Sequence, residues 1–230
     1  MALVFVQSNS SVDDTSDTSH TVTLNGVGAG NLIVLLVKFE GAATTVSVSD
    51  GTSTLTNGTM VDHGNGDLHG IWCYLLAANS GNKTYTLTLG AARPYKRLHI
   101  WEFSYSGTVA LDVQNTGSGT SAAPQSGTVT TTGTDEVALG FYGEYSGEVF
   151  SSPQINSVAA NGSRINSPAG SYTASWYRIL TATFANGRAS GTLGSVVDWI
   201  CNIITFNAVA APGRTTRNTL ASPLGMRLGR

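Results

Sequence analysis

Residues 98–107 constrain the fold of this chain more than any other stretch. They read Leu-His-Ile-Trp-Glu-Phe-Ser-Tyr-Ser-Gly, and in a β-strand alternate side chains point to opposite faces. One face would then carry His99, Trp101, Phe103 and Tyr105. The other would carry Leu98, Ile100, Glu102 and Ser104. Four rings on one side need a second sheet to cover them, and the apolar opposite side indicates burial there too. We predict a central strand.

The rest of the chain continues in short apolar or alternating runs separated by turn residues, as in a sandwich or barrel. Residues 68–77 and 83–89 are predicted to form one hairpin, and 128–132 and 136–142 another. The other predicted strands cover residues 3–7, 20–24, 31–39, 44–49, 109–113, 172–181, 188–193 and 197–206. Loops are expected at residues 8–19, 51–67, 115–126 and 143–170.

These patterns predict an all-β protein, an antiparallel β-sandwich of jelly-roll type, since no helical periodicity runs for a useful length. No linker divides the chain, so we expect a single domain over residues 1–208 and an extended C-terminal arm over 209–230. The residues expected in the core are Ile33, Leu35, Val37, Ile100, Trp101, Phe103, Leu139, Ile200 and Ile203.

Charge is scarce, and this excludes some functions. Asp, Glu, Lys and Arg make up 11% of the residues, against about 25% in an ordinary domain. A net charge of −2 gives no general attraction to nucleic acid or to a membrane.

Residues 2–6 are the only apolar run near the start and are too short for a signal peptide, and no segment is long enough to span a membrane. We expect synthesis in the cytoplasm.

No catalytic signature is found. There is no Gly-x-Ser-x-Gly nucleophile motif and no phosphate-binding loop with its lysine. Glu102 must be paired or protonated if it is buried, and Lys96, Arg97 and Arg178 are available partners. We favour a structural role for Glu102 over a general acid acting with Asp112 or Glu136. We expect no catalytic residues and no cofactor.

Binding residues of other kinds are weakly indicated. Asp62, Asn65 and Asp67 could supply oxygen ligands to calcium, but a plain turn fits their glycine-rich setting better. His63 and His69 lie beside them without an evident third ligand, so no metal site is predicted.

Cysteines and aromatics also have two interpretations. Cys73 and Cys201 each lie in an apolar run, which favours buried free thiols over a disulfide. Aromatic side chains could stack on sugars if they were exposed, but burial in the core is favoured. The candidates are Trp72, Tyr74, Trp176 and Tyr177.

The C-terminal arm differs from the nearly neutral body, since it carries four arginines and no acid. It is either a solvated end or an arm that docks on a neighbouring subunit. In a docked arm, the leucines and the methionine would be buried and the arginines would contact carboxylates. Asp13, Asp14 and Asp17 of another copy, or a capsid surface, could receive those arginines. The candidate partner-binding residues are Arg214, Arg217, Leu220, Leu224, Met226, Arg227, Leu228 and Arg230.

Several motifs resemble one family. They include Gly-Asn-Leu-Ile-Val at 30–34, the strand at 99–107 and Ser-Gly-Thr-Val-Thr-Thr-Thr at 126–132. The others lie at residues 5–8, 46–50, 110–112, 192–193 and 197–199. Over residues 3–207 the chain resembles the Ser/Thr/Gly-rich jelly-roll or immunoglobulin-like β-sandwich modules of tailed-bacteriophage structural proteins, which also occur in bacterial surface and secreted proteins.

The resemblance implies a non-enzymatic bacteriophage structural protein of the virion, as a capsid decoration (cement) or fibre-type subunit. It would be made in the host cytoplasm, form a homo-oligomer and contact other virion proteins of capsid or tail. The alternative is a carbohydrate-binding or adhesive surface module that recognises a host-surface glycan.

Overall fold

The computed structural model describes residues 3–64, 66–166 and 172–209 of the chain. It is all-β, as predicted: these residues form antiparallel strands and no helix. In the first half the strands are β1 (Val4–Asp13), β2 (Asp17–Val27), β3 (Leu32–Glu40), β4 (Val46–Ser49), β5 (Thr56–Asn57), β6 (Val61–Asp62), β7 (Leu68–Leu75), β8 (Gly81–Arg93) and β9 (Lys96–Ser104). In the second half they are β10 (Thr108–Ser121), β11 (Glu136–Gly143), β12 (Ser151–Ile155), β13 (Val158–Ala159), β14 (Gly162–Asn166), β15 (Thr173–Leu180), β16 (Ala189–Thr192) and β17 (Val197–Val209).

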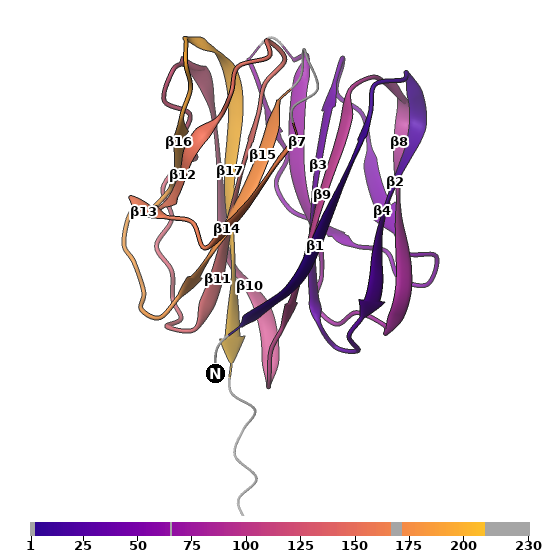
Figure 1. Cartoon of the computed structure of the whole chain (residues 1–230), viewed down its shortest axis with the longest axis vertical. Coiled ribbons are helices and arrows are strands. Elements are labelled where there is room, and N and C mark those ends of the chain that lie inside the picture. Colours follow the sequence, from indigo (N-terminus) through magenta and orange to yellow (C-terminus); the bar gives the residue numbers. More distant parts are fainter. Residues whose placement is uncertain (1–2, 65, 167–171, 210–230) are drawn as a thin grey trace, which may run out of the picture.

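The strands form four sheets stacked as layers (Figure 1). Sheet A has the order β1-β9-β3-β7-β5, with β6 also on β7, and sheet B has the order β2-β8-β4. Sheet C has the order β10-β17-β11-β15-β14, and sheet D the order β13-β12-β16. The layers follow each other as B, A, C and D, so sheets A and C are covered on both faces.

Three apolar cores fill the spaces between the layers, and all nine predicted core residues are buried in them. The core between A and B holds Ile33, Leu35, Val37 and Ile100. The central core between A and C holds Trp101, Phe103, Leu139 and Ile200. Ile203 lies in the core between C and D. A sandwich is therefore confirmed, with two more layers than a simple one, while the jelly-roll connectivity remains a prediction.

The predicted central strand is β9, which lies between β1 and β3. Trp101 and Phe103 face sheet C, and Leu98 and Ile100 face sheet B. Burial on both faces is thus confirmed. Sheet C also supplies a polar partner to the aromatic face, because Ser175 Oγ on β15 lies 2.9 Å from Trp101 Nε1 and 2.8 Å from His99 Nδ1.

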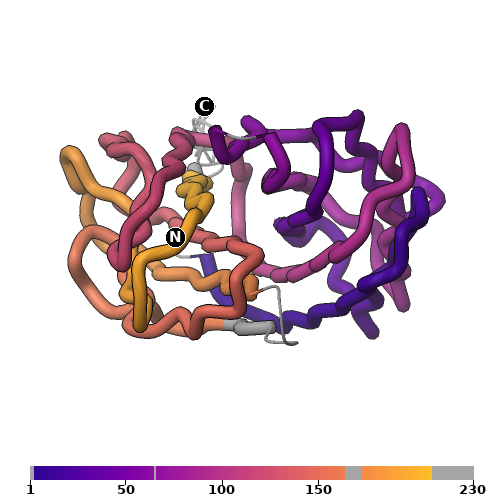
Figure 2. Tube along the Cα trace, turned by 90° about the horizontal axis from the view of Figure 1, so that it is seen from above, coloured from indigo at the N-terminus to yellow at the C-terminus, as the bar shows by residue number. Residues whose placement is uncertain are grey.

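The two halves of the chain repeat one another. Each inner sheet has the same order when β1, β9, β3 and β7 are matched with β10, β17, β11 and β15. The turn at residues 105–107 joins the halves, which lie side by side (Figure 2). Each half also encloses a core of its own, so the described residues form two sandwiches that share the central core, while the single domain over 1–208 stays a prediction.

Two matching pairs of aromatic rings join the halves across the central core. Val34 pairs with Trp101 and Tyr74, and Leu139 pairs with Ile204 and Tyr177, so Tyr74 and Tyr177 hold matching positions. By the same register, Phe103 matches Phe206. The Tyr74 and Phe206 rings meet edge to face at 5.2 Å, and the Tyr177 and Phe103 rings do so at 5.3 Å. The halves are therefore related by an approximate two-fold axis.

Both predicted hairpins are wrong. Strand β7 pairs with β3 in sheet A, whereas the next strand, β8, pairs with β2 and β4 in sheet B. Likewise β11 pairs with β15 and β17, and residues 128–132 make only an isolated bridge from Val129 to Gly187. Alternation of side chains defines the faces of a strand but not the sheet it joins.

All four predicted loops contain strands, and the one at 51–67 holds the two-residue strands β5 and β6. Much of 115–126 belongs to β10, whose Gly, Ser and Thr residues pair with β17 along a sheet edge and need no apolar side chains there. Residues 8–19 hold the end of β1 and the start of β2, and 143–170 hold β12, β13 and β14. Val209, the first residue of the predicted arm, belongs to β17, and residues 210–230 lie outside the described residues.

Candidate functional site

A hollow of about 310 Å³ lies where the two halves meet. Glu40, Gly41, Asp67 and Pro94 from the first half line it, and Tyr145 from the second half closes it. The Tyr145 hydroxyl donates a hydrogen bond of 2.8 Å to Asp198 Oδ2, which fixes the ring. The hollow thus combines a held aromatic ring with two carboxylates, which are groups that recognise small polar ligands.

A buried ion pair supports one wall of this hollow. The Lys38 amino group is fully buried and bonds the Glu40 carboxylate. Burial lowers the pKa of Lys38 to about 8, although Glu40 opposes this. Glu144 is also buried, and burial raises its pKa although it accepts hydrogen bonds from the backbone N–H groups of Ser146, Gly147 and Tyr172.

The residues considered as calcium or metal ligands lie at or next to the hollow, but their side chains do not surround a common point. Asp62 Oδ1 is 2.5 Å from His69 Nδ1, and His69 Nε2 lies 2.7 Å from the Gly41 carbonyl. His63 is 3.6 Å from Asp198 instead. Asn65 lies outside the described residues, and the residues that are described contain no group of three His, Cys, Asp or Glu able to hold a metal ion.

Glu102 is buried, but the cationic partners expected for it are wrong. Its carboxylate accepts hydrogen bonds from Gln7 Nε2 at 2.6 Å, from Gly28 N at 2.8 Å and from Asn31 Nδ2 at 2.6 Å. Lys96 and Arg97 bind other acids, and Arg178 Nη1 donates to the Ile155 carbonyl at 3.0 Å. Three neutral donors therefore satisfy this carboxylate where β1, β9 and the loop before β3 meet.

Replacement Glu102→Gln should lower the free energy of unfolding by about 1–3 kcal/mol, because the amide turns an N–H group toward donors that then lose their acceptor. Denaturant unfolding at neutral pH measures this loss. The control is Glu148→Gln, at a partly exposed carboxylate. A Glu102→Gln protein of unchanged stability that fails to assemble or bind would show that the role is functional instead.

Asp112 and Glu136, the two carboxylates considered as catalytic partners, are not near Glu102. The hydrogen-bond partners of Glu102 all belong to the first half. Asp112 and Glu136 lie close together in the second half, where Glu136 Oε1 accepts a hydrogen bond of 2.5 Å from Gly133 N. Burial raises the pKa of Glu136 to about 7, the neighbouring Asp112 adding to the effect. Asp112 is held by Thr132, whose hydroxyl donates to it at 2.6 Å. The three acids therefore do not form one site.

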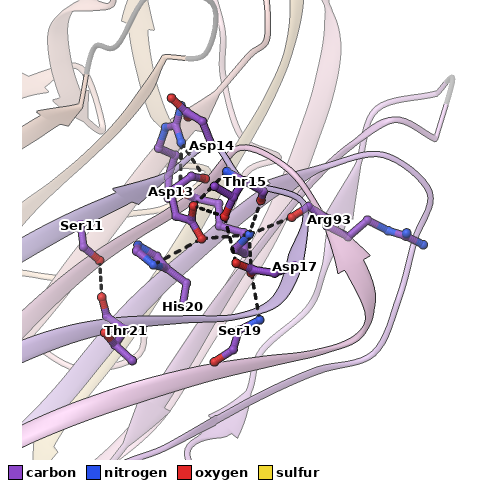
Figure 3. Close-up of polar contacts among 11 residues, drawn as sticks. Ser11, Asp13, Asp14, Thr15, Asp17, Ser19, His20, Thr21 and Arg93 are labelled. Atoms are coloured by element: carbon purple, nitrogen blue, oxygen red, sulfur yellow. Dashed lines mark hydrogen bonds and ion pairs between the residues drawn. The ribbon is translucent and has the colours of Figure 1, made fainter.

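A second polar cluster joins the β1–β2 turn to the start of β9 (Figure 3). The buried Lys96 amino group lies 3.1 Å from Asp13 Oδ2 and 2.8 Å from Asp17 Oδ1, and it donates to the Thr15 carbonyl at 2.7 Å. The buried Arg97 guanidinium lies 2.6 Å from Asp14 Oδ1. The three acids considered as targets for the arm of another copy thus already have partners in their own chain.

Asp13 should make the free energy of unfolding depend on pH under acidic conditions. Burial favours the neutral acid, but hydrogen bonds from Thr15 and Lys96 outweigh it and lower the pKa to about 2. A folded pKa below the unfolded value stabilises the fold above the unfolded pKa, here 3.8, and this contribution is lost as the pH falls toward 2. Thermal midpoints between pH 5 and 2 should therefore fall more steeply for the natural protein than for Asp13→Asn. Parallel curves would contradict the assignment.

Cys73 and Cys201 are free and buried, as predicted. They lie in different cores, Cys73 between sheets A and B and Cys201 between C and D. Burial raises the pKa of both thiols, that of Cys73 to about 12. Neither is a reactive nucleophile.

The favoured burial of the four candidate sugar-binding aromatics is confirmed. Trp72 and Trp176 are fully buried, and Tyr74 and Tyr177 nearly so. The ring that does line a hollow, Tyr145, was not identified from the sequence. Its only signal is the run Gly-Glu-Tyr-Ser-Gly at 143–147, which follows a buried strand. The candidate partner-binding residues of the arm, Arg214 to Arg230, lie outside the described residues.

In the described ranges there is no helix long and apolar enough to cross a membrane. Comparisons with protein families, with curated proteins and with solved structures found no match to this chain.

Proposed function

We propose that this chain is a non-enzymatic structural subunit of a tailed-bacteriophage virion, a capsid decoration or fibre-type protein that acts through protein–protein contacts. It is made in the host cytoplasm and ends in the particle. It joins copies of itself and other capsid or tail proteins.

The observation that carries this proposal is the stack of four sheets. Sheets A and C are covered on both faces, so the body is stiff and offers neighbours only outer faces and strand edges. On sheet B many outward positions carry hydroxyls, among them Thr21, Thr84 and Thr88. Such positions suit close packing against other subunits, because a hydroxyl carries no charge that has to be desolvated. The resemblance to the sandwich modules of phage structural proteins is the reason for proposing that these neighbours belong to a phage particle.

The test is to purify particles produced by the genome that encodes the chain and to search them for this polypeptide by mass spectrometry. The proposal expects a fixed number of copies per particle, retained through density-gradient purification. Absence from intact particles, with the protein found free in the lysate, would overturn it.

A second function, glycan binding, is favoured by the hollow between the halves. A ring for stacking against a sugar face and carboxylates for its hydroxyls are the groups such sites use. Here Tyr145 supplies the ring, and Glu40 and Asp67 supply the carboxylates.

A glycan array followed by titration of the best sugar tests this alternative. Tyr145→Ala should weaken binding at least about tenfold, which corresponds to 1.4 kcal/mol. Tyr145→Phe keeps the ring and should retain most of the affinity. Equal binding by the natural and alanine proteins would remove the hollow from consideration.

A further inference from the structure

The first three residues of β1 form a partly exposed apolar stretch at the edge of sheet A. The Phe5 ring stacks on Tyr177 at 5.2 Å, and the pairing with β9 is irregular between Phe5 and Gln7, so the two valines are the outward side chains. Strand β1 is the outermost strand of sheet A and pairs with β9 on one side. Val4, Phe5 and Val6 are 56%, 36% and 44% exposed. Proteins usually protect such edges with charge, proline or a covering segment, because an open edge can accept another strand.

The rest of the same strand is protected. The side chains of Gln7, Asn9 and Ser11 donate hydrogen bonds of 2.9, 2.8 and 2.7 Å to backbone carbonyls of β2. This row of bonds ties sheets A and B together along their shared side. The open, apolar part of the edge is therefore confined to Val4–Val6.

The end of the C-terminal arm has the sequence pattern of a β-strand. Residues 224–230 read Leu-Gly-Met-Arg-Leu-Gly-Arg, so Leu224, Met226 and Leu228 share one face. Glycines and Arg227 occupy the other face. Strict alternation of this kind is typical of a strand buried on one side. Between Val209 and Leu224 the chain can span about 50 Å when extended, which is enough to reach a neighbouring molecule.

The internal repeat indicates where the arm goes. Strand β17 matches β9, and after β9 the chain crosses to the other sandwich and becomes its edge strand β10. In the sequence, the arm follows β17 as β10 follows β9. In Figure 1 the end of β17 and the start of β1 both lie at the lower end of the molecule, so an arm about 50 Å long can reach the β1 edge of a second molecule that meets it there.

We propose that residues 224–230 of one copy add a strand to the β1 edge at Val4–Val6 of a second copy, and that the second copy returns the same contact. Backbone hydrogen bonds along the edge provide affinity, and the apolar face of the arm covers the valines. Mutual exchange closes a symmetric dimer. This inference rests on the proposed function, because it names the contact through which subunits join.

Sedimentation equilibrium of the full-length protein tests the contact with two variants. The edge variant is Val4→Lys with Val6→Lys, and the arm variant is Leu224→Asp, Met226→Asp and Leu228→Asp. Each alone should weaken self-association at least about tenfold. Their equimolar mixture should associate again, because it pairs an intact arm on one molecule with an intact edge on another.

The matched control carries lysines at two exposed valines elsewhere, Val149→Lys with Val196→Lys, and should associate like the natural protein. Circular dichroism and thermal midpoints confirm that each variant is folded. The inference is overturned if the natural protein stays monomeric, if the edge variant associates normally, or if the mixture does not recover.

The two proposals can fail separately. Particles that contain the chain while its edge variant self-associates normally would remove the arm contact alone. A mixture that recovers association, together with particles lacking the chain, would remove the virion role alone.

Discussion

Replacing Trp101 by alanine should lower the free energy of unfolding by about 3–5 kcal/mol, the range for truncating a large buried aromatic. Trp101 is 2% exposed, and its ring meets Tyr177 at 5.3 Å and Phe5 at 5.9 Å. Its Nε1 also donates to Ser175 in the opposite sheet. The substitution would therefore open a cavity in the core shared by both halves, which urea unfolding can measure.

Trp101→Phe is the matched control, since it keeps a ring between the sheets while giving up the hydrogen bond. It should cost clearly less than the alanine variant. If Trp101→Ala cost less than about 1 kcal/mol, the ordinary effect of a single substitution, the central core would not be what holds the two sandwiches together.

Ile100→Ala should cost about 2–5 kcal/mol, although its side chain points the opposite way from Trp101. Ile100 is fully buried between sheets A and B and packs with the core that includes Tyr85 and Leu87. Neighbouring residues on one strand thus test two separate cores. Chemical denaturation monitored by circular dichroism gives the value.

The exposed Val196, 66% accessible, is the control for the loss of aliphatic carbons. Val196→Ala should stay within about 0.5 kcal/mol of the natural protein. An unfolding midpoint unchanged by Ile100→Ala would place residues 98–107 away from the centre of the fold.

The fold class and the inner strands could be predicted from the sequence because burial on two faces leaves a local mark. Strand β3 reads as a nearly unbroken apolar run, and β9 alternates rings with aliphatic side chains. Outer strands such as β8 alternate polar and apolar residues, and that pattern is equally compatible with several sheets. This is why β7 and β8 were wrongly joined in a hairpin.

The candidate site was less predictable, because its parts are distant in sequence. The burial of Glu102 follows from its apolar neighbours, but the donors Gln7 and Asn31 lie 95 and 71 residues away. The hollow needs Glu40 from one half and Tyr145 from the other, so it exists only once the halves have stacked. The rings of residues 98–107 predict that a second sheet covers them, but no local pattern specifies which loops meet at the rim of that stack.

The approximate two-fold axis has a consequence for which side chains can meet in the central core. A single half with these residues would leave Tyr74, Phe103 and their neighbours bare, so each half acts as the cover of the other. Because the two halves belong to one chain, matching positions can carry different residues: Trp72 in one half corresponds to Ser175 in the other, which receives the Trp101 hydrogen bond. A symmetric homodimer of one half could not hold both residues at one position.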